Sequence, residues 1–310
     1  MAGIQVIRHA AELAPTRRKV CLGIGFFDGI HLGHQQIIRQ TIADARRHEG
    51  TALVVTFDQH PNTIVAPSRV PPLIYPLWRK IEVMEEMGAD AVLLIRFDES
   101  FSRQTGPDFI RQLSGHLPPI HSLCVGANFV FGHQRTGTVQ TLKELGENIR
   151  FTVHGLSAVS LDERPVSSTR IRETIARGDL DAASQMLGRA YSICGPVVHG
   201  DGLGRQLGFP TINVGVSGLV LPPHGVYGAH VRINRRDHRA VLNIGTRPTL
   251  GNPVPELRVE AHLIDFEGDL YGSNVEVILA DHLRPERRFN STNELREQIA
   301  RDILDAQMRF

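Results

Sequence analysis

Short apolar runs alternate with amphipathic segments between residue 19 and about residue 188. This alternation is typical of repeated strand and helix units that build a parallel sheet. Most of the runs are apolar throughout, as expected of strands that are covered on both faces. The pattern predicts a doubly wound α/β domain with a parallel sheet, whose five strands lie at residues 20–26, 52–57, 91–97, 122–127 and 151–156.

The pattern changes after residue 188, where glycine and proline become frequent and strand patterns replace the helices. The strands predicted at residues 226–233, 240–244, 257–266 and 274–279 indicate an antiparallel β-barrel. Ser291 and Glu294 have the spacing of a capping box ahead of apolar residues at helical spacing, so a C-terminal helix should pack on the barrel. We therefore expect two domains, residues 1–187 and residues 188–310, without a long linker.

The overall composition and charge argue against some classes of protein. The 310 residues are 41% hydrophobic and 22% charged, with a net charge of +1, so nothing suggests a basic field for nucleic acid or for a membrane surface. Cys21, Cys124 and Cys194 lie singly in apolar runs and predict buried thiols in a reducing compartment. No apolar run is long enough to span a bilayer. These features favour a cytoplasmic protein with small-molecule partners.

The first candidate site follows the first predicted strand. Phe27 and Asp28 begin a turn, and His31, Gly33 and His34 come where a helix begins. Unpaired backbone N–H groups and the helix dipole favour an anion there, imidazoles can add donors, and glycine permits a close approach. The same residues also suit an ordinary turn, and this short motif alone does not decide between the two.

Three further loops end at the same edge of the predicted sheet, where ligands of such sheets bind. His60 follows the second strand and Asn128 the fourth, although each also suits an ordinary loop. A helix then opens with three hydroxyl residues followed by arginines, at Ser167, Ser168, Thr169 and Arg172. These residues form a second candidate phosphate site, or else an N-cap with solvated arginines.

A glycine-rich loop occurs in the predicted barrel. Gly200, Gly202, Gly204 and Gly208 precede Thr211 and Asn213. Residues two apart in an extended segment point the same way, so the Thr211 hydroxyl and the Asn213 amide oxygen could share one ligand. Hard oxygen donors suit Mg²⁺ held jointly with substrate phosphates. The alternative is a glycine-rich hairpin that ends in these two residues.

These motifs together resemble the nucleotidylyltransferase superfamily, in which His-x-Gly-His and Ser-Ser-Thr-x-x-Arg motifs hold ATP. Within it, the likeness is closest to the bacterial bifunctional riboflavin kinase/FAD synthetase family. The resemblance implies that two groups of residues grip the ATP phosphates: His31 and His34, and Ser167, Ser168, Thr169 and Arg172. It also implies that the ATP and FMN pocket includes Phe27, Asp28, Gly33, His60 and Asn128.

The resemblance continues through the barrel and covers nearly the whole chain in order. It implies that Thr211 and Asn213 coordinate Mg²⁺, that residues 200–208 cover the ATP phosphates, and that Glu260 is the catalytic base. Arg284 is expected to help place the flavin. A strand glutamate that faces outward is also common, so Glu260 alone would not establish catalysis.

The sequence departs from the family pattern at a few positions. Phe26 stands where the family often has asparagine, Gln59 where it has proline, and Ile212 where it has alanine. An acidic residue is also common near Ala127 or Asn128. Since none of these replaces a group with a direct chemical role, they put rates in doubt more than the class of reaction.

The expected function is that of a two-step transferase. The C-terminal domain would phosphorylate riboflavin to FMN with ATP, and the N-terminal domain would adenylylate FMN to FAD with release of pyrophosphate. The alternatives are a riboflavin kinase whose N-terminal domain only binds flavin or nucleotide for regulation, and a flavin-binding protein without turnover. A class I aminoacyl-tRNA synthetase is disfavoured by the short chain and its β-rich C-terminal half. Self-association and transfer of FMN between sites stay open.

Overall fold

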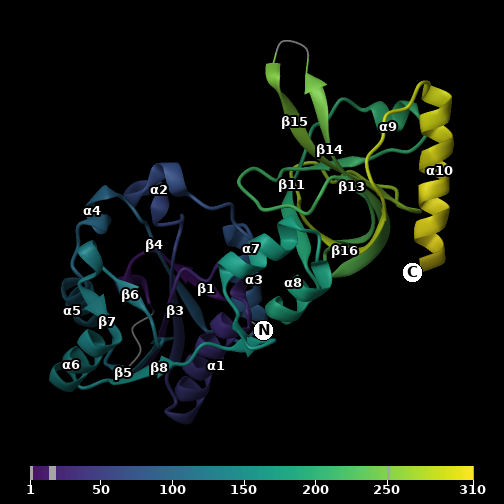
Figure 1. Cartoon of the computed structure of the whole chain (residues 1–310). Coiled ribbons are helices and arrows are strands. Elements are labelled where there is room, and N and C mark those ends of the chain that lie inside the picture. Colours follow the sequence, from purple (N-terminus) through teal and green to yellow (C-terminus); the bar gives the residue numbers. More distant parts are fainter. Residues whose placement is uncertain (1–2, 14–18, 250–251, 310) are drawn as a thin grey trace. The chain divides into compact units, whose positions relative to one another are not determined.

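The computed structural model describes residues 3–13, 19–249 and 252–309. The chain divides into two compact units (Figure 1). The first, the α/β unit, comprises Met1–Pro72 and Leu77–Arg170, and the second, the barrel unit, comprises Leu73–Pro76 and Ile171–Phe310. The domain boundary expected after residue 187 stays a prediction.

The α/β unit is built on a parallel sheet, as predicted. Its strands follow the order β1-β4-β3-β2-β5-β8. Their bounds are β1 Gln5–Ile7, β2 Val20–Ile24, β3 Thr51–Phe57, β4 Ala91–Ile95, β5 Ile120–Gly126 and β8 Thr152–Leu156. Every neighbouring pair is parallel, which brings the loops after β2, β3 and β5 to one edge of the sheet.

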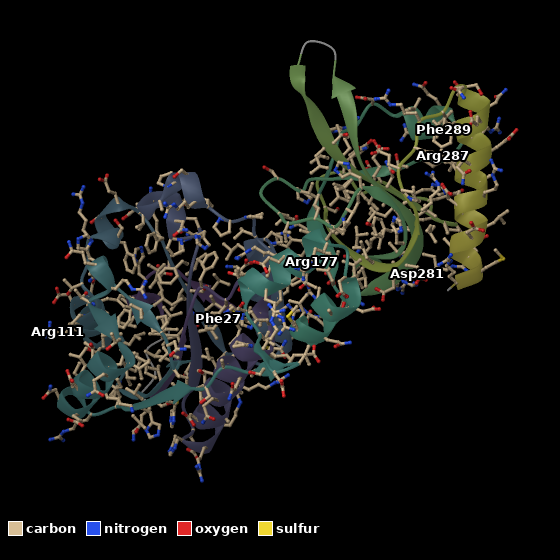
Figure 2. The ribbon with its side chains drawn as sticks, in the orientation of Figure 1. Phe27, Arg111, Arg177, Asp281, Arg287 and Phe289 are labelled. Atoms are coloured by element: carbon tan, nitrogen blue, oxygen red, sulfur yellow. The ribbon has the colours of Figure 1, made fainter. Side chains whose placement is uncertain are left out.

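Helices cover both faces of this sheet, so the α/β unit has two hydrophobic cores. The longer helices are α1 Leu32–Arg47, α3 Leu77–Glu86, α5 Gly106–His116 and α6 Val139–Ile149. One core contains Phe109 and Leu142, from α5 and α6. The other contains Ile38 and Val83, from α1 and α3. Figure 2 shows Phe27 among the side chains of this unit and the exposed Arg111 at its edge.

The sequence predicted five strands in this sheet, whereas the structure has six, because β1 was missed. This edge strand has three residues and only Ile7 is buried, so it lacks the apolar run that marked the others. It forms by pairing with β4, with Val6 opposite Val92. Such a short strand is created by tertiary contact and carries almost no signal of its own.

The barrel unit confirms the predicted antiparallel barrel and C-terminal helix. Six strands close in the order β11-β12-β15-β14-β13-β16. They are β11 Ser192–Val198, β12 Ile212–Val214, β13 Gly225–Ile233, β14 Arg236–Thr249, β15 Asn252–Leu263 and β16 Asn274–Arg284. Helix α10, Thr292–Arg309, begins where the Ser291 hydroxyl accepts a hydrogen bond from the Glu294 amide at 3.2 Å. Its Ala306 packs against Val226 and Val241 of the barrel.

The remaining elements are short. They include α2 Asn62–Val65, α4 Glu99–Ser102, α7 Ser168–Ala176, α8 Leu180–Leu187 and α9 Leu203–Gln206. Two small hairpins pair β6 Val130–Phe131 with β7 Gly137–Thr138, and β9 Ser160–Leu161 with β10 Arg164–Pro165. Single 3₁₀ turns are η1 Ala10–Glu12, η2 Asp28–Ile30, η3 Pro67–Arg69 and η4 His133–Arg135. Within the described ranges, no helix has both the length and the apolar character needed to cross a membrane.

Close packing of β2 against α1 sets the position of the helix whose start carries the histidine motif. A Cβ atom at Gly23 would lie 2.6 Å from the Thr41 hydroxyl oxygen. That hydroxyl donates to the Ile37 carbonyl at 2.9 Å, so it cannot turn away without losing a bond. Glycine is therefore required at this position of the strand.

We expect Gly23→Ala to destabilise the α/β unit by about 1–3 kcal/mol, the usual cost of overpacking a core. The double variant Gly23→Ala/Thr41→Ala removes the clashing oxygen and should recover part of this loss. Urea unfolding of the full chain measures both. A single variant as stable as the wild type would contradict the close packing.

Candidate active sites

A strained turn joins β2 to α1. Phe27 has φ of 53° and Ile30 has φ of 40°, both in the left-handed region, and Gly29 between them has φ of 75°. A β-branched residue such as Ile30 rarely takes this conformation, and strain of this kind gathers at functional sites when the surroundings over-determine it. The turn therefore needs strong external restraints.

Side chains from four elements supply these restraints by donating to carbonyls of the turn. The Phe26 carbonyl accepts from the Lys80 ammonium of α3 and from the Thr56 hydroxyl of β3, each at 3.2 Å. The Ser168 hydroxyl of α7 donates to the Asp28 carbonyl at 3.0 Å, and the Gln35 amide of α1 donates to the Ile30 carbonyl at 3.0 Å. With its carbonyls held by these donors, the turn leads directly into the first-turn amides of α1, which have no carbonyl partner within the helix.

The two histidines lie against each other at the start of α1. His31 is the N-cap, and its Nδ1 accepts from the His34 backbone N–H at 3.4 Å. Their rings stack with centroids 3.6 Å apart, and the Phe27 ring meets His34 edge-on at 5.3 Å. Burial, followed by the nearby His31 and Lys80, holds the pKa of His34 well below its ordinary value. Neutral His34 hydrogen-bonds to the backbone of Asp28. The Asp28 carbonyl also accepts the hydrogen bond from the Ser168 hydroxyl.

The structure thus brings the first two sequence motifs together at Asp28. Ser167 caps α7 by accepting from the Arg170 amide at 3.2 Å. Thr169 is exposed on the first turn of the same helix, and Arg172 follows half-buried. Gly33 lies in the first turn of α1, where a Cβ atom would come 3.3 Å from the His31 ring.

The other two predicted residues lie on the neighbouring loops. The His60 ring meets Phe26 edge-on at 4.8 Å, and its Nδ1 accepts from the Asn62 amide at 3.0 Å. Asn128 occupies an exposed turn directly after β5. His60 is therefore tied to the strained turn through Phe26, whereas Asn128 is placed only by its strand.

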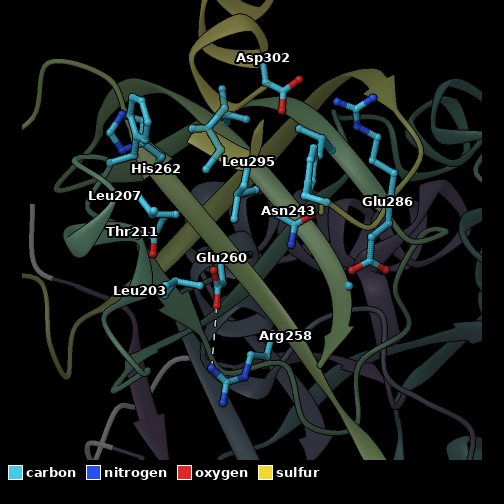
Figure 3. Close-up of a pocket in the computed structure, with 18 of the residues that line it drawn as sticks. Leu203, Leu207, Thr211, Asn243, Arg258, Glu260, His262, Glu286, Leu295 and Asp302 are labelled. Carbon is cyan, nitrogen blue, oxygen red and sulfur yellow. Dashed lines mark ion pairs between the residues drawn. The ribbon is translucent and has the colours of Figure 1, made fainter. Parts of the chain in front are cut away.

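The barrel unit contains a cavity of about 310 Å³ between strands, α9 and α10 (Figure 3). Glu260 lines it, and in the strand register this residue pairs with Asn213 of β12 on one side and Asn243 of β14 on the other. Directly opposed residues share a face of a sheet, so the three polar side chains project from the same face. Thr211 also lines the cavity, one residue before β12 begins.

The glycine-rich loop closes over Thr211 and Asn213. A Cβ atom at Gly200 would overlap the Asn213 amide, and one at Gly204 would come 3.0 Å from the Thr211 hydroxyl. Arg258, beside Glu260 at 4.0 Å, also pairs with Asp201 of the loop at 2.9 Å. The loop contains helix α9, which the glycine pattern did not predict. Gly202 and Gly208 flank this helix with φ of 69° and 87°.

Arg284 lies at the α10 side of the cavity. Its guanidinium forms a two-pronged pair with the buried Asp302 carboxylate, with Nε–Oδ1 at 2.9 Å and Nη2–Oδ2 at 2.7 Å. Asp302 also accepts from Gln298 at 2.7 Å. The fixed geometry of such a pair orients Arg284 at the cavity wall.

Sequence reasoning missed several residues of both sites. Lys80 holds the strained turn but is far from the motifs in sequence, and Thr56, which also holds it, lies four positions before His60 and had no predicted role. Asn243 and Asp302 line the cavity. Asn243 did carry a signal, because it is the single polar residue in the predicted strand at 240–244. No three His, Cys, Asp or Glu side chains in the described part of the chain are grouped so that they could hold a metal ion.

Comparisons with known proteins agree with two modules in this order. A family model described as FAD synthetase matches residues 13–170, and one described as riboflavin kinase matches residues 187–310. The bifunctional riboflavin kinase/FMN adenylyltransferase of Escherichia coli is 36% identical, over 99% of this chain and 98% of that protein. Its counterpart from Bacillus subtilis is 34% identical, over 97% and 96%. A crystal structure described as a macrolide-efflux protein from Streptococcus pneumoniae superposes with a TM-score of 0.81 at 27% identity, over 99% of both chains.

The lowered pKa of His34 predicts how stability depends on pH. Below pH 6.5, the ordinary value, the unfolded chain binds a proton at His34 that the folded chain does not. The folded state should therefore lose up to about 1.4 kcal/mol per pH unit as the pH falls below that value. His34→Gln should remove this component in urea unfolding at pH 7 and pH 5. An NMR titration in which the folded His34 ring titrates at the same pH as in urea-denatured protein would contradict it.

Proposed function

Because the chain belongs to the bifunctional riboflavin kinase/FMN adenylyltransferase family, we propose that each of its two sites performs one of the two reactions. The chain is a transferase with an FAD synthetase domain and a riboflavin kinase domain. We assign adenylyl transfer to the turn between β2 and α1, and phosphorylation to the barrel cavity. The family resemblance inferred from the motifs is confirmed.

In the adenylyl-transfer site, a phosphate oxygen of FMN would attack the α-phosphorus of ATP, and the bond to pyrophosphate would break. Such a step needs alignment and charge neutralisation, because the protein forms no covalent bond. The observation that carries the assignment is the Ser168 bond to the Asp28 carbonyl, which joins the second motif to the first beside His34. His31, His34 and the first-turn amides of α1 would then face the triphosphate, and the α7 hydroxyls would grip it from the other side.

In the kinase site, Glu260 would accept the proton of the riboflavin 5′-hydroxyl. The 5′-oxygen of riboflavin would attack the γ-phosphorus of ATP, and ADP would leave. The register that sets Glu260 between Asn213 and Asn243 supports this role, since the two amides can orient the carboxylate and substrate. Residues 200–208 would cover the phosphates, because Arg258 ties Asp201 to the strand of Glu260. Arg284, fixed by Asp302, would place the flavin.

Thr211 of the cavity and the nearby Asn213 also fit Mg²⁺. Thr211 and Asn213 offer a hydroxyl and an amide oxygen, and the glycine loop leaves no room for a side chain above them. Mg²⁺ prefers such oxygen ligands together with substrate phosphates, whose charge it neutralises when bound. The closing glycines hold these two donors beneath the phosphates.

The substrates we propose are therefore small molecules: ATP, riboflavin and FMN. We also place the chain in the cytoplasm. Cys21, Cys124 and Cys194 are buried free thiols, which suit a reducing compartment.

Paired variants test the division of labour. Glu260→Gln should lower riboflavin phosphorylation by about 10²–10⁴-fold, the usual loss for a general base, and leave FAD formation from supplied FMN unchanged. His31→Ala should do the reverse. Chromatography that follows riboflavin, FMN and FAD measures both reactions in one sample. Equal loss of both products in a folded variant would contradict the assignment, and a wild type that makes FMN but no FAD would favour the kinase-only alternative.

The proposed Mg²⁺ ligands give a separate test. Asn213→Ala should raise the Mg²⁺ concentration needed for half-maximal riboflavin phosphorylation by about tenfold or more, as expected when one of few oxygen ligands is lost. Its dependence of FAD formation on Mg²⁺ should match that of the wild type. Asn243→Ala, which removes the amide on the other side of Glu260, is the matched control. An equal shift in both variants would argue against a specific role of Asn213.

A further inference from the structure

A buried lysine of helix α3 contacts the strained turn between β2 and α1. Lys80 is 2% exposed, lies on α3, and donates to the Phe26 carbonyl at 3.2 Å. Its ammonium also lies 4.2 Å from the centre of the Phe26 ring. Neither the sequence motifs nor the reaction scheme above uses this residue.

Helix α3 carries a second buried cation, whose charge is balanced by ion pairs. Arg79 is 4% exposed and pairs with Glu86 at 2.8 Å and Glu82 at 3.3 Å. Burial instead lowers the pKa of Lys80 to about 8, even though the nearby Asp28 acts in the opposite direction. Positive charge at Lys80 is therefore costly in the absence of ligand.

We propose that Lys80 is a positioning residue for adenylyl transfer: its ammonium fixes the Phe26 carbonyl and supplies positive charge behind the turn that receives the ATP triphosphate. The inference rests on the proposed function of this site. An anion at the start of α1 would favour the charged form of Lys80, since an opposite charge stabilises an ammonium. Lys80 would then hold the turn most firmly when ATP is bound.

The charge of Lys80 should appear in the pH dependence of the reaction. The groups that face it are the Asp28 carboxylate on η2 and His34 on α1. The pKa of His34 lies well below its ordinary value, so His34 stays neutral above pH 7. As the pH rises through about 8, Lys80 of the free enzyme loses its proton, and kcat/KM for ATP should fall.

Three variants of the full chain test the proposal with FMN and ATP between pH 7 and pH 9.5. Lys80→Met should lower kcat/KM for ATP by about 10–100-fold at pH 7, as expected for the loss of one electrostatic contact, and should abolish the alkaline fall. Lys80→Arg keeps a permanent charge, so its kcat/KM should stay level where that of the wild type falls. Arg79→Met, the matched control, should keep the wild-type pH profile. Riboflavin phosphorylation should be unchanged in all three.

Thermal unfolding separates this role from a purely structural one. Lys80→Met removes a costly buried charge and also one restraint of the turn, while Thr56 still donates to the Phe26 carbonyl, so its melting temperature at pH 7 should stay close to that of the wild type. The proposal is overturned if Lys80→Met keeps kcat/KM within twofold, or if either Lys80 variant retains the alkaline fall. Should Lys80→Met fail to fold, the pH profile of Lys80→Arg decides alone. A wild type that forms no FAD would instead refute the proposed function itself, and the role of Lys80 with it.

Discussion

The proposed adenylyl-transfer site depends on one constraint: the turn between β2 and α1 must hold a left-handed backbone at Phe27 and Ile30. Donors outside the turn hold its carbonyls in this conformation. Lys80, Ser168 and Gln35 come from three different helices. The shape of the turn therefore depends on contacts across the α/β unit, and the anion site proposed at the main-chain amides of α1 depends on the same contacts.

The barrel positions its candidate site in a different way. The groups proposed to react there are side chains in adjacent strands, and the hydrogen-bond register sets Glu260 between Asn213 and Asn243. A shift of one residue in β15 would turn Glu260 to the other face. The closed order of the six strands prevents such a slip, because β15 is paired on both sides. Main-chain strain positions one site, and strand register positions the other.

The extent to which sequence predicted these sites follows from this difference. His31, His34 and Ser168 could be proposed from short motifs, whereas the role of Glu260 was expected only from the family resemblance. The contact of Lys80 with the turn could not be predicted, because it arises from the packing of α3 against residues that lie more than fifty positions earlier in the chain. Strand β1 was missed for the same reason, since three residues with one buried side chain become a strand only beside β4. The fold could therefore be predicted from apolar periodicity. Much of the candidate site could not, because it depends on polar contacts between residues far apart in the sequence.

The electrostatics of the proposed adenylyl-transfer site also has a consequence for binding. His34 and Lys80, which influence each other, both have a lowered pKa because burial disfavours their charged forms. A triphosphate bound at the proposed site would oppose that effect at both groups, since nearby negative charge raises the pKa of a base. Binding of ATP should therefore be coupled to proton uptake when the pH lies near or above about 8.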